Sequence, residues 1–219
     1  CYYSNMKIVH FSDLHSDFEI LKDIEKPDLW ICTGDFMPNF TNPAMEKNKR
    51  LRIEREEQGQ WFHDNMSKIN EYLRDVPIFW TGGNHDFIKP FGLNKLTYFH
   101  EGIYAEFQGL RFAGFPEIPS LNGYWSGEVG TQEMLRICQS VFSQPFDVLL
   151  THSPPRDILD NVSYWGVESV GSLPIKYSVM NSEIKLHCFG HIHEQGGKQV
   201  VIENKIFSNA ATVFNTIEL

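Results

Sequence analysis

The sequence lacks the features expected of a membrane-spanning protein, a secreted protein or a protein that wraps a long nucleic acid. It contains no run of about 18 apolar residues, the length that a membrane-spanning helix needs. No charged leader followed by an apolar core is present, so we expect no secretory signal and a cytoplasmic protein. The net charge is −9, with 19 basic and 28 acidic residues, which argues against a protein that wraps long nucleic acid.

Cysteine is scarce and shows no pattern. The four cysteines, Cys1, Cys32, Cys138 and Cys188, form no Cys-x-x-Cys pair, and two of them lie within apolar runs. We expect buried, reduced thiols rather than disulfides or metal ligands. Residues 1–5 resemble a cloning remnant, so we expect the natural chain to begin at Met6.

Internal repeats, linkers and low-complexity stretches are also missing from the sequence. The chain has 219 residues, of which 42% are apolar and 14% aromatic, a composition typical of a folded protein with a sizeable core. We therefore expect a single domain over residues 6–219.

What the sequence does contain is a repeated design, in which an apolar run of strand length ends in a group able to bind a metal ion. These runs lie within residues 7–15, 28–34, 77–83, 147–151 and 185–190. In the same order, the groups that follow them are Asp13 and His15, Asp35, Asn84 and His85, His152, and His191 with His193. Residues two apart in an extended chain point to the same side, so Asp13 and His15 can bind one ion. Ligands of an open sheet sit beyond the carboxyl ends of its strands, so we expect the five ends to meet.

These groups resemble the motifs of the calcineurin-like metallophosphoesterases, which are Asp-x-His, Gly-Asp, Gly-Asn-His-Asp/Glu, a lone His and Gly-His-x-His, in that order. The corresponding residues here are Asp13-x-His15, Gly34-Asp35, Gly83-Asn84-His85-Asp86, His152 and Gly190-His191-x-His193. The resemblance spans nearly the whole chain. The order of strands and helices indicates a mixed α/β protein, and the resemblance implies the four-layer α/β/β/α sandwich of that family, with two mixed sheets flanked by helices.

The resemblance also implies two divalent metal ions. The implied ligands are Asp35 for both ions, Asp13, His15 and His193 for the first, and Asn84, His152 and His191 for the second. Carboxylate, imidazole and amide ligands without a thiolate suit borderline ions, with Mn²⁺ expected first and Fe, Zn, Co or Ni as alternatives. Two ions about 3.5–4 Å apart can clamp the entering and departing oxygens at phosphorus and make hydroxide available at neutral pH.

His85 follows a metal ligand but stays uncoordinated in the family pattern. The resemblance implies that it contacts the phosphate and protonates the departing oxygen, with Asp86 orienting its ring; a pKa near neutral suits that step. Arg156 can grip a phosphate through its guanidinium, although a surface ion pair is an equal alternative. The histidines outside the motifs are expected to be structural or exposed, and these are His10, His63, His100 and His187.

A long helix is predicted from about residue 44 to Arg74. In its second half, apolar residues recur at four-three-four spacing, typical of a stripe that faces the core, at Phe62, Met66, Ile69 and Leu73. Its first half, residues 46–58, is strongly charged, and we expect a solvent-exposed face with mutual ion pairs. The alternative is a lip beside the site that meets an anionic substrate through Lys47, Lys49, Arg50 and Arg52.

Shorter elements are predicted around this helix. Ser16 and Glu19 have the spacing of a capping box for a short helix that ends near Pro27. Residues 103–115 alternate as a hairpin that turns at Gln108-Gly109. We further expect a helix capped by Thr131, a helix within residues 173–182, and strands at 198–202, 206–208 and 212–219.

One departure from the family narrows the substrate class. Members that act on phosphoproteins extend the second motif to Gly-Asp-x-x-Asp-Arg-Gly, and here Pro38 stands in place of the second Asp. Thr-His-x-Pro-Pro at residues 151–155 is closer to the small one-domain phosphodiesterases. We expect hydrolysis of a small phosphodiester such as a cyclic or short nucleotide. The alternative is a phosphomonoesterase or 5′-nucleotidase, and a remote one is a non-catalytic interaction scaffold.

Overall fold

The computed structural model describes residues 5–42, 44–163 and 168–219. Its helices are α1 (Lys47–Leu73), α2 (Thr131–Val141) and α3 (Leu173–Met180), with two short 3₁₀ turns, η1 (Phe18–Leu21) and η2 (His193–Gln195). Four of the five residues that we expect to be a cloning remnant lie outside the described residues.

The strands form two large sheets and two short ladders. The first sheet has the order β15-β1-β2-β3-β4 and consists of β1 (Lys7–Phe11), β2 (Leu29–Cys32), β3 (Ile78–Trp80), β4 (Leu96–Tyr98) and β15 (Phe214–Glu218). The second has the order β13-β14-β12-β9-β6-β5 and consists of β5 (Tyr104–Phe107), β6 (Leu110–Phe115), β9 (Val148–Thr151), β12 (Leu186–Phe189), β13 (Lys198–Ile202) and β14 (Lys205–Asn209). The ladders pair β7 (Ile118–Pro119) with β8 (Glu128–Val129), and β10 (Asn161–Val162) with β11 (Glu168–Ser169).

Both large sheets are mixed, as predicted. Strands β1 to β4 are parallel, and β15 pairs antiparallel with β1 at the edge. In the second sheet β6, β9, β12 and β14 are parallel, with antiparallel β5 and β13 at the edges. The five apolar runs are therefore β1, β2 and β3 of one sheet and β9 and β12 of the other. Parallel strands share a direction, so within each sheet their carboxyl ends lie at one edge.

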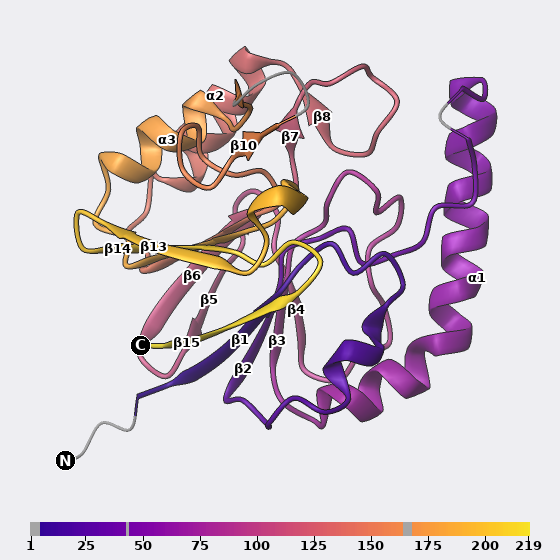
Figure 1. Cartoon of the computed structure of the whole chain (residues 1–219), viewed down its shortest axis with the longest axis horizontal. Coiled ribbons are helices and arrows are strands. Elements are labelled where there is room, and N and C mark those ends of the chain that lie inside the picture. The colour runs from indigo at the N-terminus through magenta and orange to yellow at the C-terminus, as the bar shows by residue number, and fades with distance from the viewer. Residues whose placement is uncertain (1–4, 43, 164–167) are drawn as a thin grey trace.

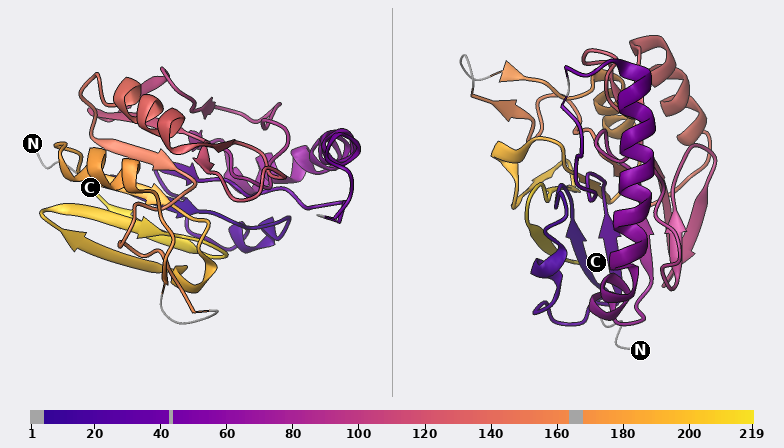
Figure 2. Two further views of the ribbon diagram at one scale, coloured as in Figure 1. Left: turned by 90° about the horizontal axis from the view of Figure 1, so that it is seen from above. Right: turned by 90° about the vertical axis from the view of Figure 1, so that its right-hand side faces the viewer.

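Side chains on successive residues alternate between separate cores, because both faces of each sheet are covered. In β2, Leu29 and Ile31 face the space between the sheets, where Val148 of the second sheet also packs. Trp30 and Cys32 face the opposite side, toward α1 and η1. A third core lies between the second sheet and helices α2 and α3. Figure 1 shows α1 on one flank and α2 with α3 on the other, and Figure 2 shows the same layers from two further sides, which confirms the predicted sandwich.

The long helix is confirmed as α1. In its second half Phe62, Ile69 and Leu73 are buried against the first sheet, and Met66 packs against the same core while partly exposed. This half of the helix follows the predicted stripe.

Most charged side chains in the first half of α1 are solvent-exposed, as predicted, but one row of polar residues in this half is buried. Arg50, Glu54 and Gln58 are at most 1% exposed. We call these three residues the polar row of α1. Buried charged groups are stable only when they are paired or hydrogen-bonded, so the polar row must have partners in neighbouring loops.

The predicted capping box is wrong. Ser16 has a left-handed φ of +78°, and η1 begins two residues later without a side-chain cap. The N–H group of Ser16 donates to the carbonyl of Phe36 at 2.8 Å, while Glu19 accepts from Lys68 and from the hydroxyl of Tyr72. The hydrogen bond to the loop after β2 therefore fixes the backbone conformation of Ser16.

Most other predicted elements are confirmed with small shifts. The hairpin consists of β5 and β6, and α3 falls inside the predicted range. Helix α2 begins at Thr131 itself, with Gly130 in the cap position. The cysteines within the described residues, Cys32, Cys138 and Cys188, are free and buried. No described helix combines the length and the apolar composition that crossing a membrane would require.

Two of the histidines outside the motifs, His10 and His187, are fully buried. The ring nitrogens of His10 each lie 2.9 Å from a hydroxyl oxygen, those of Ser208 and Thr33. Nε2 of His187 lies 2.8 Å from the hydroxyl of Thr151. Burial lowers the pKa of each imidazole to about 3, so both are neutral in the folded protein at neutral pH.

We expect the free energy of unfolding to fall as the pH drops from about 6.5 toward 3. The unfolded chain protonates these two histidines near pH 6.5, whereas the folded chain does so only near pH 3. Each histidine then contributes a loss of up to about 1.4 kcal/mol per pH unit within this window. Urea unfolding of metal-free protein at several pH values measures the slope. A His10→Gln, His187→Gln variant keeps polar side chains that do not titrate, so its slope should be smaller. An equal slope in both proteins would contradict this account.

Candidate metal centre

The predicted ligands sit in loops that leave the carboxyl ends of parallel strands, and several of these loops turn sharply. Asp13, His15, Asp35 and His191 have left-handed φ angles of +54°, +43°, +52° and +68°. Such backbone costs about 1–3 kcal/mol per residue and persists only where the surrounding structure imposes it. These four residues lie where the strand ends converge, whereas other left-handed residues, such as Gln108 and Asn204, occupy hairpin turns.

Glycines allow these loops to approach one another closely. A Cβ atom on Gly34 would lie 2.3 Å from the backbone nitrogen of Gly83, so the loops after β2 and β3 meet backbone to backbone. A Cβ atom on Gly190 would lie 2.1 Å from Oδ2 of Asp13. A larger residue at Gly34 would push these two loops apart, and one at Gly190 would displace the carboxylate of Asp13.

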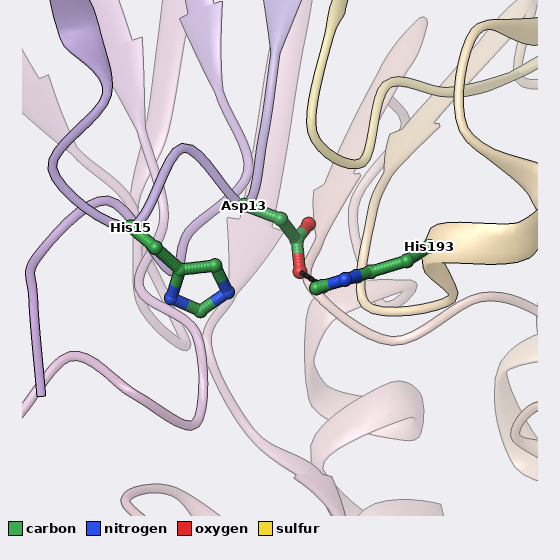
Figure 3. Close-up of side chains that lie close together, drawn as sticks. All are labelled: Asp13, His15 and His193. Carbon is green, nitrogen blue, oxygen red and sulfur yellow. Dashed lines mark hydrogen bonds and ion pairs between the residues drawn. The ribbon is translucent and has the colours of Figure 1, made fainter.

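Asp13, His15 and His193 form the first group of candidate ligands. Each offers one ligand atom, and these atoms lie within 4.8 Å of one another. Figure 3 shows the carboxylate of Asp13 between the two imidazole rings, with Oδ1 at 3.2 Å from Nε2 of His193. Oδ2 of Asp13 accepts the hydroxyl of Ser12 at 2.6 Å and the backbone N–H of His191 at 2.9 Å. The carboxylate is therefore held in a fixed orientation, with Oδ1 directed at the group.

Asp35, His152 and His191 form the second group, whose ligand atoms also lie within 4.8 Å of one another. Nε2 of His152 is 3.1 Å from Oδ2 of Asp35 and 3.1 Å from Oδ1 of Asn84. Nδ1 of His152 is 2.7 Å from the carbonyl of Thr33. A carbonyl can only accept, so Nδ1 carries a hydrogen, and in the neutral ring Nε2 presents its lone pair to the group.

The charges of the second group suit a cation. Burial by itself would raise the pKa of Asp35, but His152 and His85 hold it well below its usual range. Burial would lower the pKa of His152, but Asp35 and Asp13 raise it to about 10. A proton on His152 and a divalent ion therefore compete for the same carboxylates.

His85 lies beside both groups and belongs to neither. Its ring centroid is 4.9 Å from that of His15, and its Nε2 is 3.9 Å from Oδ2 of Asp35. Its backbone N–H donates to Oδ1 of Asp35 at 2.6 Å. Nδ1 lies 2.7 Å from Nδ2 of Asn39, so an asparagine meets the edge of the ring.

Asp86 holds backbone rather than the ring of His85, which corrects the orienting role expected for it. Its two carboxylate oxygens accept four hydrogen bonds of 2.8–3.1 Å. The donors are the backbone N–H groups of Asp35, Phe36, Met37 and Gly83. The side chain of Asp86 therefore fastens the loop after β2 to the loop after β3.

Three of the cationic residues considered for substrate binding, Arg50, Lys47 and Arg156, lie in different surroundings. Arg50 is 1% exposed, its guanidinium lies 4.2 Å over the ring of Trp125, and it donates to the carbonyl of Tyr124 at 3.0 Å. It is therefore engaged within the protein, which removes it from the substrate lip that was the alternative for this half of the helix. Lys47 is exposed at the start of α1. Arg156 is exposed and lines a cavity of about 390 Å³, whose described lining includes none of the predicted metal ligands.

Sequence reasoning missed Asn39 and Trp125 beside His85, because Asn39 departs from the extended second motif and Trp125 belongs to none of the motifs. It also missed that the polar row is buried. A signal was present in the spacing: residues 50, 54, 58 and 62 follow one another every four positions. The polar row thus continues the apolar stripe along the same face of α1.

The fold and the two ligand groups together define an α/β sandwich with a candidate dinuclear metal centre. The family model of the calcineurin-like phosphoesterases matches residues 6–195. The UPF0046 protein K07C11.7 of Caenorhabditis elegans is 26% identical over 233 residues, which cover 95% of this chain and 68% of that protein. A solved crystal structure superposes with a TM-score of 0.67 at 17% identity, covering 98% of this chain and 95% of the other, and so shares the fold. The chain belongs to the calcineurin-like phosphoesterase family.

Proposed function

We propose that this protein is a phosphodiesterase that depends on two divalent metal ions and acts on a small phosphodiester, such as a cyclic or short nucleotide. The observation that carries the proposal is the convergence of two three-residue groups at the strand ends, each with its ligand atoms within 4.8 Å. His85 lies against both groups and leaves its Nε2 directed at Asp35.

The residues present fit two such ions. Those that would hold them are Asp13, His15 and His193 for one ion, Asn84, His152 and His191 for the other, and Asp35 between the two. Carboxylate, imidazole and amide donors suit Mn²⁺, our first expectation, and also Fe, Zn, Co or Ni. When bound, such ions supply positive charge to the phosphoryl oxygens and activate water at neutral pH.

The side chains and backbone of the protein orient the reacting groups. The backbone N–H of His85 and Nε2 of His152 contact the two oxygens of Asp35, at 2.6 Å and 3.1 Å. Nε2 of His85, which lies 3.9 Å from Oδ2 of Asp35, is the proton donor that we propose for the departing oxygen. Fixed donors and acceptors of this kind lower the barrier because they need no rearrangement during the reaction.

The placement of Arg50 and Arg156 favours a diester over a monoester. A phosphomonoester carries up to two negative charges and is well matched by an arginine fork. Arg50 is engaged with Trp125 and Tyr124, and Arg156 lines a separate cavity. A diester carries a single charge and depends less on such a grip.

With Mn²⁺, we expect hydrolysis of bis-p-nitrophenyl phosphate to exceed that of p-nitrophenyl phosphate in kcat/KM by about tenfold or more, roughly 1.4 kcal/mol in transition-state binding. Release of nitrophenolate measures both reactions, and chelation by EDTA should stop them. The reverse preference would favour the phosphomonoesterase or 5′-nucleotidase. Absence of hydrolysis with each of Mn, Fe, Zn, Co and Ni would favour the scaffold.

A further inference from the structure

Two segments contact the ring of His85: residues 36–42, which follow Gly34-Asp35 directly, and residues 121–129. From the first segment, Nδ2 of Asn39 lies 2.7 Å from Nδ1 of the ring. From the second, the ring of Trp125 lies 4.2 Å from the ring of His85 between centroids, with the planes inclined at 44°. The proposed function gives neither residue a task.

Trp125 is held from α1. The guanidinium of Arg50 lies 4.2 Å over its ring and 5.5 Å over the ring of Phe87. Nη1 of Arg50 also donates to the carbonyl of Tyr124 at 3.0 Å. A cation–π contact is stronger when the cation is shielded from water, and Arg50 is 1% exposed.

The segment that carries Trp125 is fixed at two further points. The carboxylate of Glu128 accepts the backbone N–H of Trp125 at 2.8 Å and those of the preceding turn, Leu121, Asn122 and Gly123, at 2.6–3.0 Å. The N–H of Ser126 donates to the carbonyl of Asn84 at 3.0 Å. The segment is thereby tied directly to the loop that carries a predicted metal ligand.

Asn39 is held by the rest of the polar row. Glu54 accepts the backbone N–H groups that follow Asn39, those of Phe40 and Thr41, with the shortest contacts at 3.1 Å and 2.9 Å. Nε2 of Gln58 donates to the carbonyl of Pro38 at 3.0 Å and to that of His85 at 2.7 Å. Gln58 therefore links the segment of Asn39 to the backbone of His85.

We propose that Asn39 and Trp125 are positioning residues, which hold the ring of His85 with Nε2 directed at the phosphoryl group, and that the polar row holds both in place. The inference rests on the proposed function for the role of His85. The NH₂ group of Asn39 faces Nδ1 of the ring and can only donate, so Nδ1 of the neutral ring accepts this hydrogen bond and the ring hydrogen lies on Nε2, toward the site.

An aromatic residue beside such a site can also bind the substrate by stacking against it. A nucleobase needs an accessible face of the ring on which to stack. The guanidinium of Arg50 covers the ring of Trp125, and the ring of His85 packs against it. These contacts favour positioning.

The two tasks predict different kinetics. Trp125→Ala should lower kcat for a dinucleotide by about 10²-fold, the scale of a misplaced catalytic group, and change KM little. Trp125→Phe keeps an aromatic face and should restore most of the rate. The loss with bis-p-nitrophenyl phosphate should be smaller, because nitrophenolate departs without a proton. An unchanged kcat, equal losses on both substrates, or a raised KM at constant kcat would each overturn the proposal.

A spectroscopic readout decides the question without turnover. In Zn²⁺-loaded protein with ¹⁵N-labelled histidine at about pH 8, we expect the His85 ring to show a single tautomer with the hydrogen on Nε2. Asn39→Ala should shift the ring toward a mixture of tautomers, whereas the exposed control Asn181→Ala should not. Identical His85 signals in Asn39→Ala and wild type would overturn the proposal. If the wild type hydrolyses neither substrate, the proposed function fails, and these spectra still test the positioning.

Discussion

An Asp35→Asn variant is expected to retain fewer than two metal ions per chain and to lose at least about 10³-fold in phosphodiester hydrolysis, since metal-ion stabilisation is worth several kcal/mol. The asparagine amide is neutral and has one oxygen in place of two, so it cannot bind two cations as a carboxylate does. It also removes the carboxylate that lies 3.1 Å from Nε2 of His152. Metal analysis by mass spectrometry and turnover of bis-p-nitrophenyl phosphate measure the two effects.

Asp147 provides a matched control, because it lies at the amino end of a strand and the candidate ligands lie beyond the carboxyl ends. Asp147 precedes β9, where its carboxylate accepts the N–H of Arg111 at 2.9 Å and lies 2.8 Å from Nζ of Lys185. Asp147→Asn should keep its metals and its turnover. Two metals per chain with near-normal turnover in Asp35→Asn would show that Asp35 has been assigned wrongly.

His85→Ala is expected to keep two metals per chain and to lose about 10²–10⁴-fold with a nucleotide substrate, the usual range for general acid catalysis. The metals should stay because His85 contributes to Asp35 through its backbone N–H, which alanine retains. The loss should be far smaller with a nitrophenyl ester, because nitrophenolate has a low pKa and hardly needs a proton. Single-turnover rates with both substrates separate this step from product release.

His63→Ala, at an exposed position of α1, is the control for general effects of removing a histidine. If His85→Ala slows both substrates equally, His85 binds the phosphate through its positive charge instead of donating a proton. Loss of metal in His85→Ala would place His85 among the ligands.

The candidate ligands were predictable from sequence because the information is local. Asp13, Asp35 and His152 each follow an apolar run by one to three residues, and parallel pairing brings such strand ends to one edge. The four layers were implied by the family resemblance, and continuously apolar runs such as β2 agree with them, because a strand that is covered on both faces is apolar throughout. The family resemblance supplied the assignment of ligands to two ions.

The surroundings of His85 were not predictable, because they depend on contacts between distant segments. Arg50 donates to a carbonyl 74 positions away, and its spacing from Glu54 and Gln58 indicates a shared helix face without indicating which segment packs against that face. Asp86 was expected to orient the ring of His85, but its carboxylate oxygens accept hydrogen bonds from four backbone N–H groups. The cap at Ser16 failed because its N–H bonds to the loop after β2. Local patterns do not report such pairings.

The same contacts explain how the strained loops persist. Left-handed backbone at Asp13, Asp35 and His191 opposes folding, and hydrogen bonds from backbone N–H groups to buried carboxylates offset that cost. Asp86 binds the N–H of Asp35, and Asp13 binds that of His191. Acidic side chains that belong to the site or adjoin it therefore stabilise the backbone of the site.

The most direct test of the two-metal centre is anomalous diffraction at the manganese edge from crystals of the Mn²⁺-loaded protein, with Asp35→Asn crystals for comparison. We predict two peaks per chain in the wild type. One should lie within ligand reach of Asp13, His15 and His193, the other within reach of Asn84, His152 and His191, and Asp35 should touch both. In Asp35→Asn at least one peak should be lost. A single peak in the wild type, or two peaks away from these residues, would contradict the account.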